Sequence, residues 1–280
     1  MKWTPEAEVA IRKVPGFVKK KVRARIEKEA AAAGKTVVSP TEVKATQKQF
    51  LSGKGPEIKG YEIEVCFGPN GCPNRANPAD ELTGKIEALL EKEDLLSFLK
   101  AQVPEGLKFH HNFRVAISEC PNACSQPQIK DIGILGASIP LLTDQECSRC
   151  EACVDACRDN AVTLDENTDK PHFDYDRCPS IDYHRCLSCG KCIQACPTGT
   201  IGEGPLGYRI QLGGKLGRHP QLARELDGIF SVDQVLAIVK DCIQFYKENS
   251  RNGQRFAEIF SDAYPGSTFR DLAFKAKPGE

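Results

Sequence analysis

The 280-residue chain lacks any apolar run close to the roughly 20 residues that a membrane-spanning helix needs. Its first residues, MKWTPEAEVAIRK, are charged and lack the apolar core of a secretory signal. We therefore expect a cytoplasmic protein in a reducing compartment. There, clustered cysteines bind metals or redox centres and do not form disulfides.

The chain also lacks net charge, with 38 Lys and Arg against 38 Asp and Glu, but its charges are segregated. Residues 1–60 carry 14 basic and 6 acidic side chains, a surplus of +8, and residues 144–185 carry 5 and 11, a deficit of −6. The basic segment Lys19–Lys28 (KKKVRARIEK) fits either a solvated helix face or an anionic partner. Nucleic acid is the weaker candidate partner, because no aromatic side chains interleave with these charges.

A nicotinamide or flavin motif is absent as well. The segment GEGPLG (Gly202–Gly207) matches the GxGxxG pattern, but it contains Pro205 and follows a cysteine run instead of a strand. No acidic residue in a βαβ context follows it, so the segment predicts a turn. Electrons are then expected to come from a separate donor protein.

What the chain does have is 14 cysteines. Cys147–Cys157 (CSRCEACVDAC) and Cys186–Pro197 (CLSCGKCIQACP) share one spacing, typical of bacterial ferredoxins with two [4Fe-4S] clusters. In that spacing, the fourth cysteine of each run binds the other cluster. The expected ligand sets are Cys147, Cys150, Cys153 and Cys196 for one cluster, and Cys186, Cys189, Cys192 and Cys157 for the other.

Two cysteines fall outside these sets and outside the four discussed next. Cys178 lies in the long link between the runs, where Arg158 replaces the usual proline, and it is either a free thiol or a substitute ligand. Cys242 shares a helical apolar stripe with Val235 and Tyr246, in a helix opened by Ser231 as its N-cap, and is predicted to be core.

The last four cysteines form two pairs, Cys66 and Cys72 in CFGPNGCP, and Cys120 and Cys124 in CPNAC. Zinc-binding pairs usually have two intervening residues. Spacings of five and three suit a third [4Fe-4S] cluster better.

These two pairs resemble the cluster-binding motif of the siroheme-dependent sulfite and nitrite reductases. DIGILGASIP (Asp131–Pro140) looks like the strand that follows the second pair in that family, and GYRIQLGGKLGRHPQLA (Gly207–Ala223) looks like its cofactor-contacting strand and turn. The resemblance implies an α+β fold with a mixed or antiparallel sheet, flanked by helices. We expect the reductase module at 56–140 and 206–280, interrupted by a ferredoxin domain at 141–205.

Two local features complete the expected fold. Asp80–Gln102 predicts one long helical region, with an imperfect pattern around Glu91–Asp94, and Gln211–Gly214 predicts a strand ending in a glycine turn. Trp3–Val43 is similar to the small C-terminal domain of the light-independent protochlorophyllide reductase catalytic subunit. Residues 1–55 are therefore expected to form a small helical domain.

The reductase resemblance implies siroheme, with Cys124 bridging its iron to the third cluster and Asn122 shaping the turn. Arg114, Lys215 and Arg218 are candidate partners for the siroheme carboxylates, with an exposed surface charge as the alternative for each. Gly213 and Gly214 would let the backbone approach the macrocycle. Lys215 and Arg218, with Cys124, are the expected catalytic residues.

The resemblance also implies six-electron reduction of sulfite to sulfide, with nitrite as the alternative substrate. The chain contains one half-module and lacks the family's preceding substrate-side subdomain, so we expect a homodimer. A non-catalytic electron-transfer protein is a second hypothesis from another class, and a nucleic-acid-binding iron–sulfur protein is a third that rests only on the basic N-terminal segment.

Overall fold

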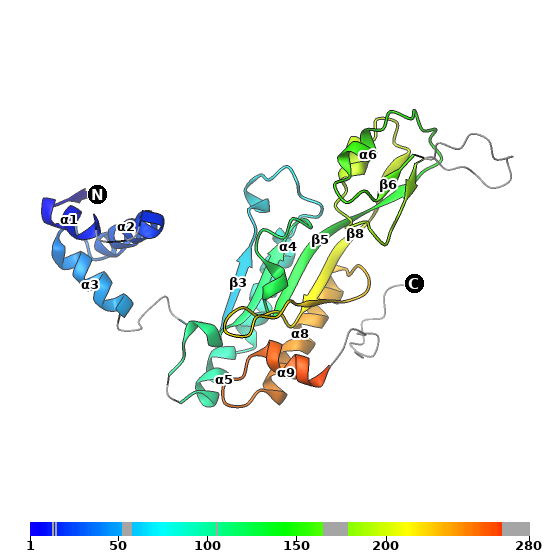
Figure 1. Ribbon diagram of the computed structural model, residues 1–280. Coiled ribbons are helices and arrows are strands. Elements are labelled where there is room, and N and C mark those ends of the chain that lie inside the picture. Colours follow the sequence, from blue (N-terminus) through cyan, green and yellow to red (C-terminus); the bar gives the residue numbers. More distant parts are fainter. Residues whose placement is uncertain (13, 15, 52–57, 105, 165–178, 265–280) are drawn as a thin grey trace. The chain divides into compact units, whose positions relative to one another are not determined.

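A computed structural model describes the chain except for residues 13, 15, 52–57, 105, 165–178 and 265–280 (Figure 1). The chain divides into two compact units, Met1–Ile58 and Lys59–Glu280. Across the described residues, no helix is both long and apolar enough to cross a membrane.

The N-terminal unit packs three helices beside a two-stranded parallel sheet. Its elements in chain order are β1 Lys2–Trp3, α1 Pro5–Arg12, α2 Gly16–Ala32, β2 Val37–Val38 and α3 Pro40–Leu51. The Trp3 indole donates to Glu27 at 2.7 Å, and the Arg23 guanidinium lies 4.4 Å from the centre of its ring. Arg23 also pairs with Glu8, so this part of the basic segment is engaged within the unit.

The larger unit is built on a five-stranded mixed sheet in the order β3-β4-β5-β8-β9 (Figure 1). The strands are β3 Tyr61–Val65, β4 Phe113–Ser118, β5 Ile132–Leu142, β8 Ile201–Leu212 and β9 Arg224–Glu225. The first three are parallel, and β8 and β9 are antiparallel to their neighbours. Most residues of β4 and β5 are buried on both faces, which explains their nearly continuous apolar sequences. The expected mixed α+β fold is confirmed, as is the strand predicted at Asp131–Pro140.

One face of this sheet carries the main hydrophobic core. The core includes side chains from α4 Asp80–Lys92, α5 Leu95–Gln102, α8 Val232–Asn249 and α9 Phe256–Ala263. Three short 3-10 helices, η1 Gly68–Asn70, η2 Phe109–His111 and η3 Pro127–Ile129, lie in connections. The predicted helical region divides into α4 and α5 because Asp94 takes a left-handed conformation (φ 42°) and caps α5 by accepting from Ser97 N–H.

α8 begins as predicted, with Ser231 as N-cap in a capping box with Gln234. Its apolar stripe lies in the core, and Cys242 is fully buried there, as the sequence predicted. The predicted strand end is also confirmed, since β8 stops at Leu212 and Gly213 turns with φ 78°.

Between β5 and β8 the chain leaves the sheet and forms the inserted segment, residues 143–200, which contains both cysteine runs. This segment holds α6 Ala152–Ala156, β6 Val162–Thr163, β7 Ser180–Ile181 and α7 Lys191–Ala195, with β6 and β7 antiparallel. α6 and α7 each lie inside one cysteine run. Each helix contains the third cysteine of its run and ends just before the fourth.

The prediction of a turn at Gly202–Gly207 is wrong, because this segment forms the first half of strand β8. It pairs with the far half of β5, and the register shifts between Ser138 and Pro140 on the partner strand. Leu206 pairs with Ser138 and Glu203 with Pro140, so β8 carries an extra residue at this irregularity. Pro205 lies there, where its missing N–H is tolerated.

Candidate functional site

The two cysteine pairs outside the inserted segment follow neighbouring strands. Cys66 comes directly after β3, and Cys120 comes two residues after β4. These strands are parallel, with Val65 opposite Ile117, so their carboxyl ends meet at one edge of the sheet. The Cys66 N–H donates to the Ile117 carbonyl at 2.9 Å, which extends the pairing to the first cysteine.

The four thiols of these pairs lie near one another. Burial raises the pKa of the Cys120 thiol, and the neighbouring thiols Cys124, Cys66 and Cys72 raise it further. The Cys66 sulfur accepts from two backbone N–H groups, those of Gly68 and Glu119, each at 3.3 Å. Backbone N–H groups directed at sulfur are a feature of iron–sulfur sites, where they tune the potential.

Cys124 is the exposed member of the group, and the Asn122 side-chain amide donates to its sulfur at 3.0 Å. Asn122, which was predicted to shape this turn, therefore contacts Cys124, the thiol expected to bridge two metal centres. An exposed thiol that already accepts a hydrogen bond can face a further group outside the four-cysteine set.

Glu119 is a site residue that the sequence reasoning missed. Its side chain is 1% exposed, pairs with Arg75 at 2.6 Å and accepts from the Ala79 N–H at 2.8 Å. Its carbonyl accepts from the N–H groups of Ala76 and Asn77. Because Glu119 directly precedes Cys120, these contacts hold the segment that follows Cys72 close to the second cysteine pair. An acidic residue at the buried end of an apolar strand was the available signal.

In the inserted segment, four thiols line one cavity: Cys157, Cys186, Cys189 and Cys192. Burial raises the pKa of Cys192 to about 12, and the other three thiols contribute to the rise. This is the set in which the first run supplies its fourth cysteine to the second run. Pro140 of β5 lines the same cavity.

The other set of the inserted segment is also brought together. Burial raises the pKa of Cys153, and the thiols of Cys196 and Cys147 add to that rise. Cys150, the exposed member, has its pKa lowered first by the Ala152 N–H. The crossing of fourth cysteines predicted from spacing thus has a counterpart in both groups.

Within the described residues, no three His, Cys, Asp or Glu side chains converge tightly enough to hold a single metal ion. A mononuclear zinc site places its sulfurs about 2.3 Å from one ion.

The predicted basic residues lie at the other edge of the sheet. Arg114 is near the start of β4 and pairs with Glu62 at 3.3 Å, and Lys215 follows the end of antiparallel β8 and pairs with Glu258 at 2.9 Å. Arg218 is exposed. The structure therefore separates these side chains from the edge that carries Cys66 and Cys120. The crossover 119–131, which contains the second cysteine pair, runs from one edge to the other.

The two glycines predicted to face the macrocycle both lie close to other parts of the protein. A Cβ on Gly213 would lie 2.6 Å from Phe260, and one on Gly214 would lie 2.6 Å from the Gln128 carbonyl and 2.7 Å from that of Lys130. Close packing within the protein therefore excludes a side chain at both positions, and the approach of this backbone to a macrocycle stays a prediction.

A buried polar group near the same edge was also missed. Asp131 is 2% exposed, accepts from the Arg114 N–H at 2.9 Å and lies 3.7 Å from the Arg255 guanidinium. Burial raises the pKa of Asp131, and the two arginines oppose that rise. In the described part of the chain, the buried Nε and Nη2 atoms of Arg255 have no hydrogen-bond partner. The Arg255 guanidinium already faces the Asp131 carboxylate as an ion-pair partner, so a second anion there would have to share it.

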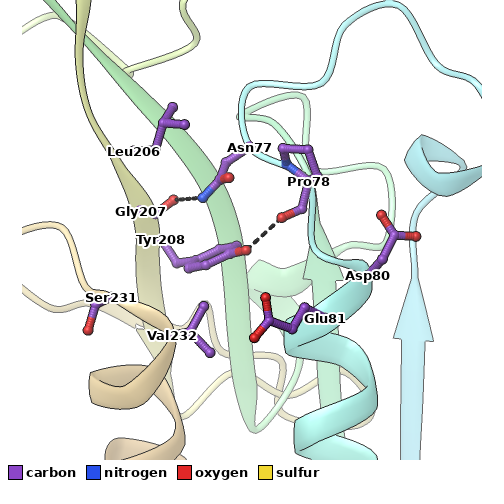
Figure 2. Close-up of a pocket in the computed structure, with 9 residues that line it drawn as sticks. All are labelled: Asn77, Pro78, Asp80, Glu81, Leu206, Gly207, Tyr208, Ser231 and Val232. Carbon is purple, nitrogen blue, oxygen red and sulfur yellow. Dashed lines mark hydrogen bonds between the residues drawn. The ribbon is translucent and has the colours of Figure 1, made fainter.

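A pocket at the N-terminal ends of α4 and α8 contains none of the predicted site residues (Figure 2). Tyr208 donates to the Pro78 carbonyl at 2.6 Å and Asn77 donates to that of Gly207, so these contacts join the two sides. The pocket has no thiol and no basic side chain. Cys178, the remaining cysteine, lies outside the described residues.

Residues 63–263 match the family described as the nitrite and sulphite reductase 4Fe-4S domain, and residues 3–46 match the proto-chlorophyllide reductase 57 kD subunit. The chain is 29% identical over 198 residues to the coenzyme F420-dependent sulfite reductase of Methanocaldococcus jannaschii, covering 71% of this chain and 29% of the relative.

It is 26% identical over 199 residues to the beta subunit of the dissimilatory-type sulfite reductase of Nitratidesulfovibrio vulgaris, covering 65% and 49%. The crystal structure of dissimilatory sulfite reductase I aligns with a TM-score of 0.45 and 18% identity, over 71% of this chain and 49% of that one. The chain spans half or less of the length of these proteins. Because the family match covers most of the chain, this protein belongs to the nitrite and sulphite reductase 4Fe-4S domain family, a family of iron–sulfur oxidoreductases.

Proposed function

We propose that this protein is a siroheme- and iron–sulfur-dependent reductase that converts sulfite to sulfide with six electrons from a separate donor protein. It would hold three [4Fe-4S] clusters, two of them in the inserted segment acting as a ferredoxin domain. The observation that carries the proposal is the group of four thiols at the ends of two parallel strands, with Cys124 exposed and hydrogen-bonded by Asn122. Family membership and the sulfite reductases among the relatives support the choice of substrate.

The residues of this chain fit a polycarboxylate macrocycle in part. Cys124 would present its sulfur to the siroheme iron while it stays in the third cluster. Arg255 is paired with Asp131, and Arg114 and Lys215 are paired with Glu62 and Glu258. Each of these arginine and lysine side chains would have to exchange or share its carboxylate to bind the new anions. Siroheme, when bound, would supply the iron at which the oxyanion is reduced.

Basic side chains would hold the oxyanion and favour the loss of its oxygen atoms as water. Arg218 is exposed and is available for this role, whereas Lys215 is held by Glu258. The structure places Arg114 and Lys215 away from the end of the sheet that carries Cys66 and Cys120, so we propose that a second copy supplies the basic side chains of the site in a homodimer. Nitrite is the alternative substrate, because it too is a small oxyanion that requires six electrons.

The test begins with anaerobic purification from a host that makes siroheme, followed by iron analysis, chromophore extraction and spectroscopy. We expect siroheme, iron for three clusters and one heme, and sulfite-dependent oxidation of reduced methyl viologen that is faster than with nitrite. Cys124→Ser should change both the heme and third-cluster signals, and Cys242→Ala, in the core, is the matched control with full iron. Clusters without a tetrapyrrole, and no turnover, would instead indicate an electron-transfer protein.

A further inference from the structure

The five-stranded sheet of the larger unit ends in two very different edge strands. β9, at one end of the strand order, is only two residues long. β3, at the other end, has five residues, and its pairing with β4 runs without irregularity from Tyr61 to Val65 (Figure 1). A very short edge strand offers little backbone to another chain, whereas a longer regular one presents a row of unpaired groups. β3 is therefore the edge at which a further strand can be added.

Every second residue of β3 directs its backbone groups away from β4. The Gly60 carbonyl and the Cys66 N–H, which flank the strand, both bond to β4, at 3.0 and 2.9 Å. Residues of a parallel strand alternate between the two sides, so the N–H and carbonyl groups of Tyr61, Ile63 and Val65 point outward. In the part of the chain that the structure describes, no backbone hydrogen bond reaches these outward groups.

The side chains beside this edge leave it open. Tyr61 and Ile63 are half-buried and pack against the core, as do Leu89 of α4 and Phe98 of α5. Val65 remains 37% exposed. β3 contains neither a proline nor a lysine, which are the residues that commonly prevent an edge strand from pairing. The apolar face of the sheet thus continues to an edge that these side chains do not block.

The charged side chains of β3 are neutralised within the chain. Glu62 pairs with Arg114 at 3.3 Å, and Glu64 pairs with Lys130. A basic peptide would therefore gain little electrostatic attraction from this edge. A second copy of the chain would present the same neutral row, and the two cations offset the repulsion between carboxylates that face each other across the new pair.

We infer that the free edge of β3 binds a second copy of this chain, with the two β3 strands antiparallel about a twofold axis at Ile63. Tyr61 then pairs with Val65 of the partner subunit, and Ile63 pairs with Ile63 of the partner subunit. In this register every outward N–H and carbonyl of the strand has a partner. The apolar side chains of both strands also lie on one face, where their exposed area is buried.

The interface deepens the homodimer of the proposed function and rests on it. Because the two strands are antiparallel, the start of β3 in one copy lies beside the end of β3 in the other. That end leads directly into Cys66. Each copy is thereby brought to the edge of the sheet at which the other copy carries its four thiols.

Hydrogen exchange resolved to single amides tests this pairing in the full-length protein, purified anaerobically. Sedimentation at the same concentrations reports whether the chain is a monomer or a dimer. In the dimer, exchange at Tyr61, Ile63 and Val65 should slow at least about tenfold, which corresponds to about 1.4 kcal/mol. Dilution to the monomer should restore fast exchange. The amides of Glu62 and Glu64 face β4 and serve as internal controls, because they should be protected in both states.

A proline at the end of the strand separates pairing from folding. Val65→Pro removes an outward N–H and leaves the bonds between β3 and β4, a position at which an edge strand tolerates proline. It should weaken the dimer at least about tenfold and remove the protection of Tyr61 and Ile63. Val65→Thr is the matched control, because it keeps the N–H and the branched Cβ, and it should dimerise like the unaltered protein. Continued protection of Glu64 in both variants shows that β3 is still in place.

The outcomes distinguish the interface from the proposed activity. A protein that stays monomeric, or a dimer in which Tyr61 and Ile63 exchange rapidly, would overturn the inference. Protection of these amides in the monomer would also overturn it, because another part of the chain would then cover the edge. A dimer paired through β3 that does not reduce sulfite would support the inference and refute the proposed function alone.

Discussion

Glu119 directly precedes Cys120, and replacing it should loosen the segment that holds Cys66, Cys72, Cys120 and Cys124. Glu119→Ala leaves the Ala79 N–H without its acceptor in a fully buried position, which costs about 1–3 kcal/mol. Local opening exposes that amide to exchange, and each 1.4 kcal/mol corresponds to about a tenfold change in an equilibrium constant. We therefore expect hydrogen exchange at Ala79 to speed up by roughly 5- to 150-fold.

Hydrogen–deuterium exchange with mass spectrometry, on anaerobic protein, measures this directly. Glu119→Gln keeps the shape and can still accept from Ala79, so its exchange should lie much closer to that of the unaltered protein. Asp80→Asn removes the other, largely exposed partner of Arg75 and should change little, because exposed ion pairs contribute little. Exchange in Glu119→Ala within about twofold of the unaltered protein would fall below the lower limit and refute the reasoning.

Three other substitutions have equally definite outcomes. Asn122→Leu removes the hydrogen bond to the Cys124 sulfur and should lower the reduction potential of the third cluster, measured by redox titration, because a thiolate without that bond stabilises the oxidised cluster more; an unchanged potential would contradict this. Gly214→Ala should lower the free energy of unfolding by about 1–3 kcal/mol in urea, because the new Cβ would lie 2.6 Å from backbone atoms. Gly217→Ala is the control, since its Cβ would meet open space and only the positive φ of that residue would be unfavourable. Equal effects of the two substitutions would refute the steric argument. Lys35 and Ser39 lower the pKa of Glu42 to about 2. Glu42 therefore adds stability to the N-terminal unit that is present above pH 4.5 and is lost as the pH falls toward 2. Unfolding followed by tryptophan fluorescence should show that Glu42→Gln flattens this pH dependence, and an unaltered pH profile would contradict the argument.

The cysteine groups could be predicted from the sequence because cluster ligation imposes spacing on the chain itself. In each run the first two thiols lie in a loop, the third lies in a short helix, and the fourth directly follows that helix. α8 was equally accessible, since its apolar period and its Ser231 cap are local signals. Neither prediction needed knowledge of which segments lie side by side.

Features set by long-range packing could not be predicted. Gly202–Gly207 resembles a loop in composition, and only its pairing with β5 makes it a strand. Gly214 is required by carbonyls of the η3 segment, far away in the sequence. Glu119 and Arg75 are also distant in sequence, and the charge on Arg75 gave no sign of its partner. The ion pair of Glu119 with Arg75 and the close packing of Gly214 can be recognised only after the strands have been placed in register.

The long strands β5 and β8 carry the inserted segment at one end of their paired ladder. A two-stranded ribbon is only marginally stable by itself and would let the segment swing on its base. The bonds from Ser138 and Arg209 to the second cysteine run prevent this, because they tie the segment to the sheet beside its own base. Lys191 of the second cysteine run also donates to the Pro73 carbonyl at 3.4 Å, beside Cys72. The place of the second cysteine run on the sheet therefore depends on a few polar contacts as well as on the ladder of β5 and β8.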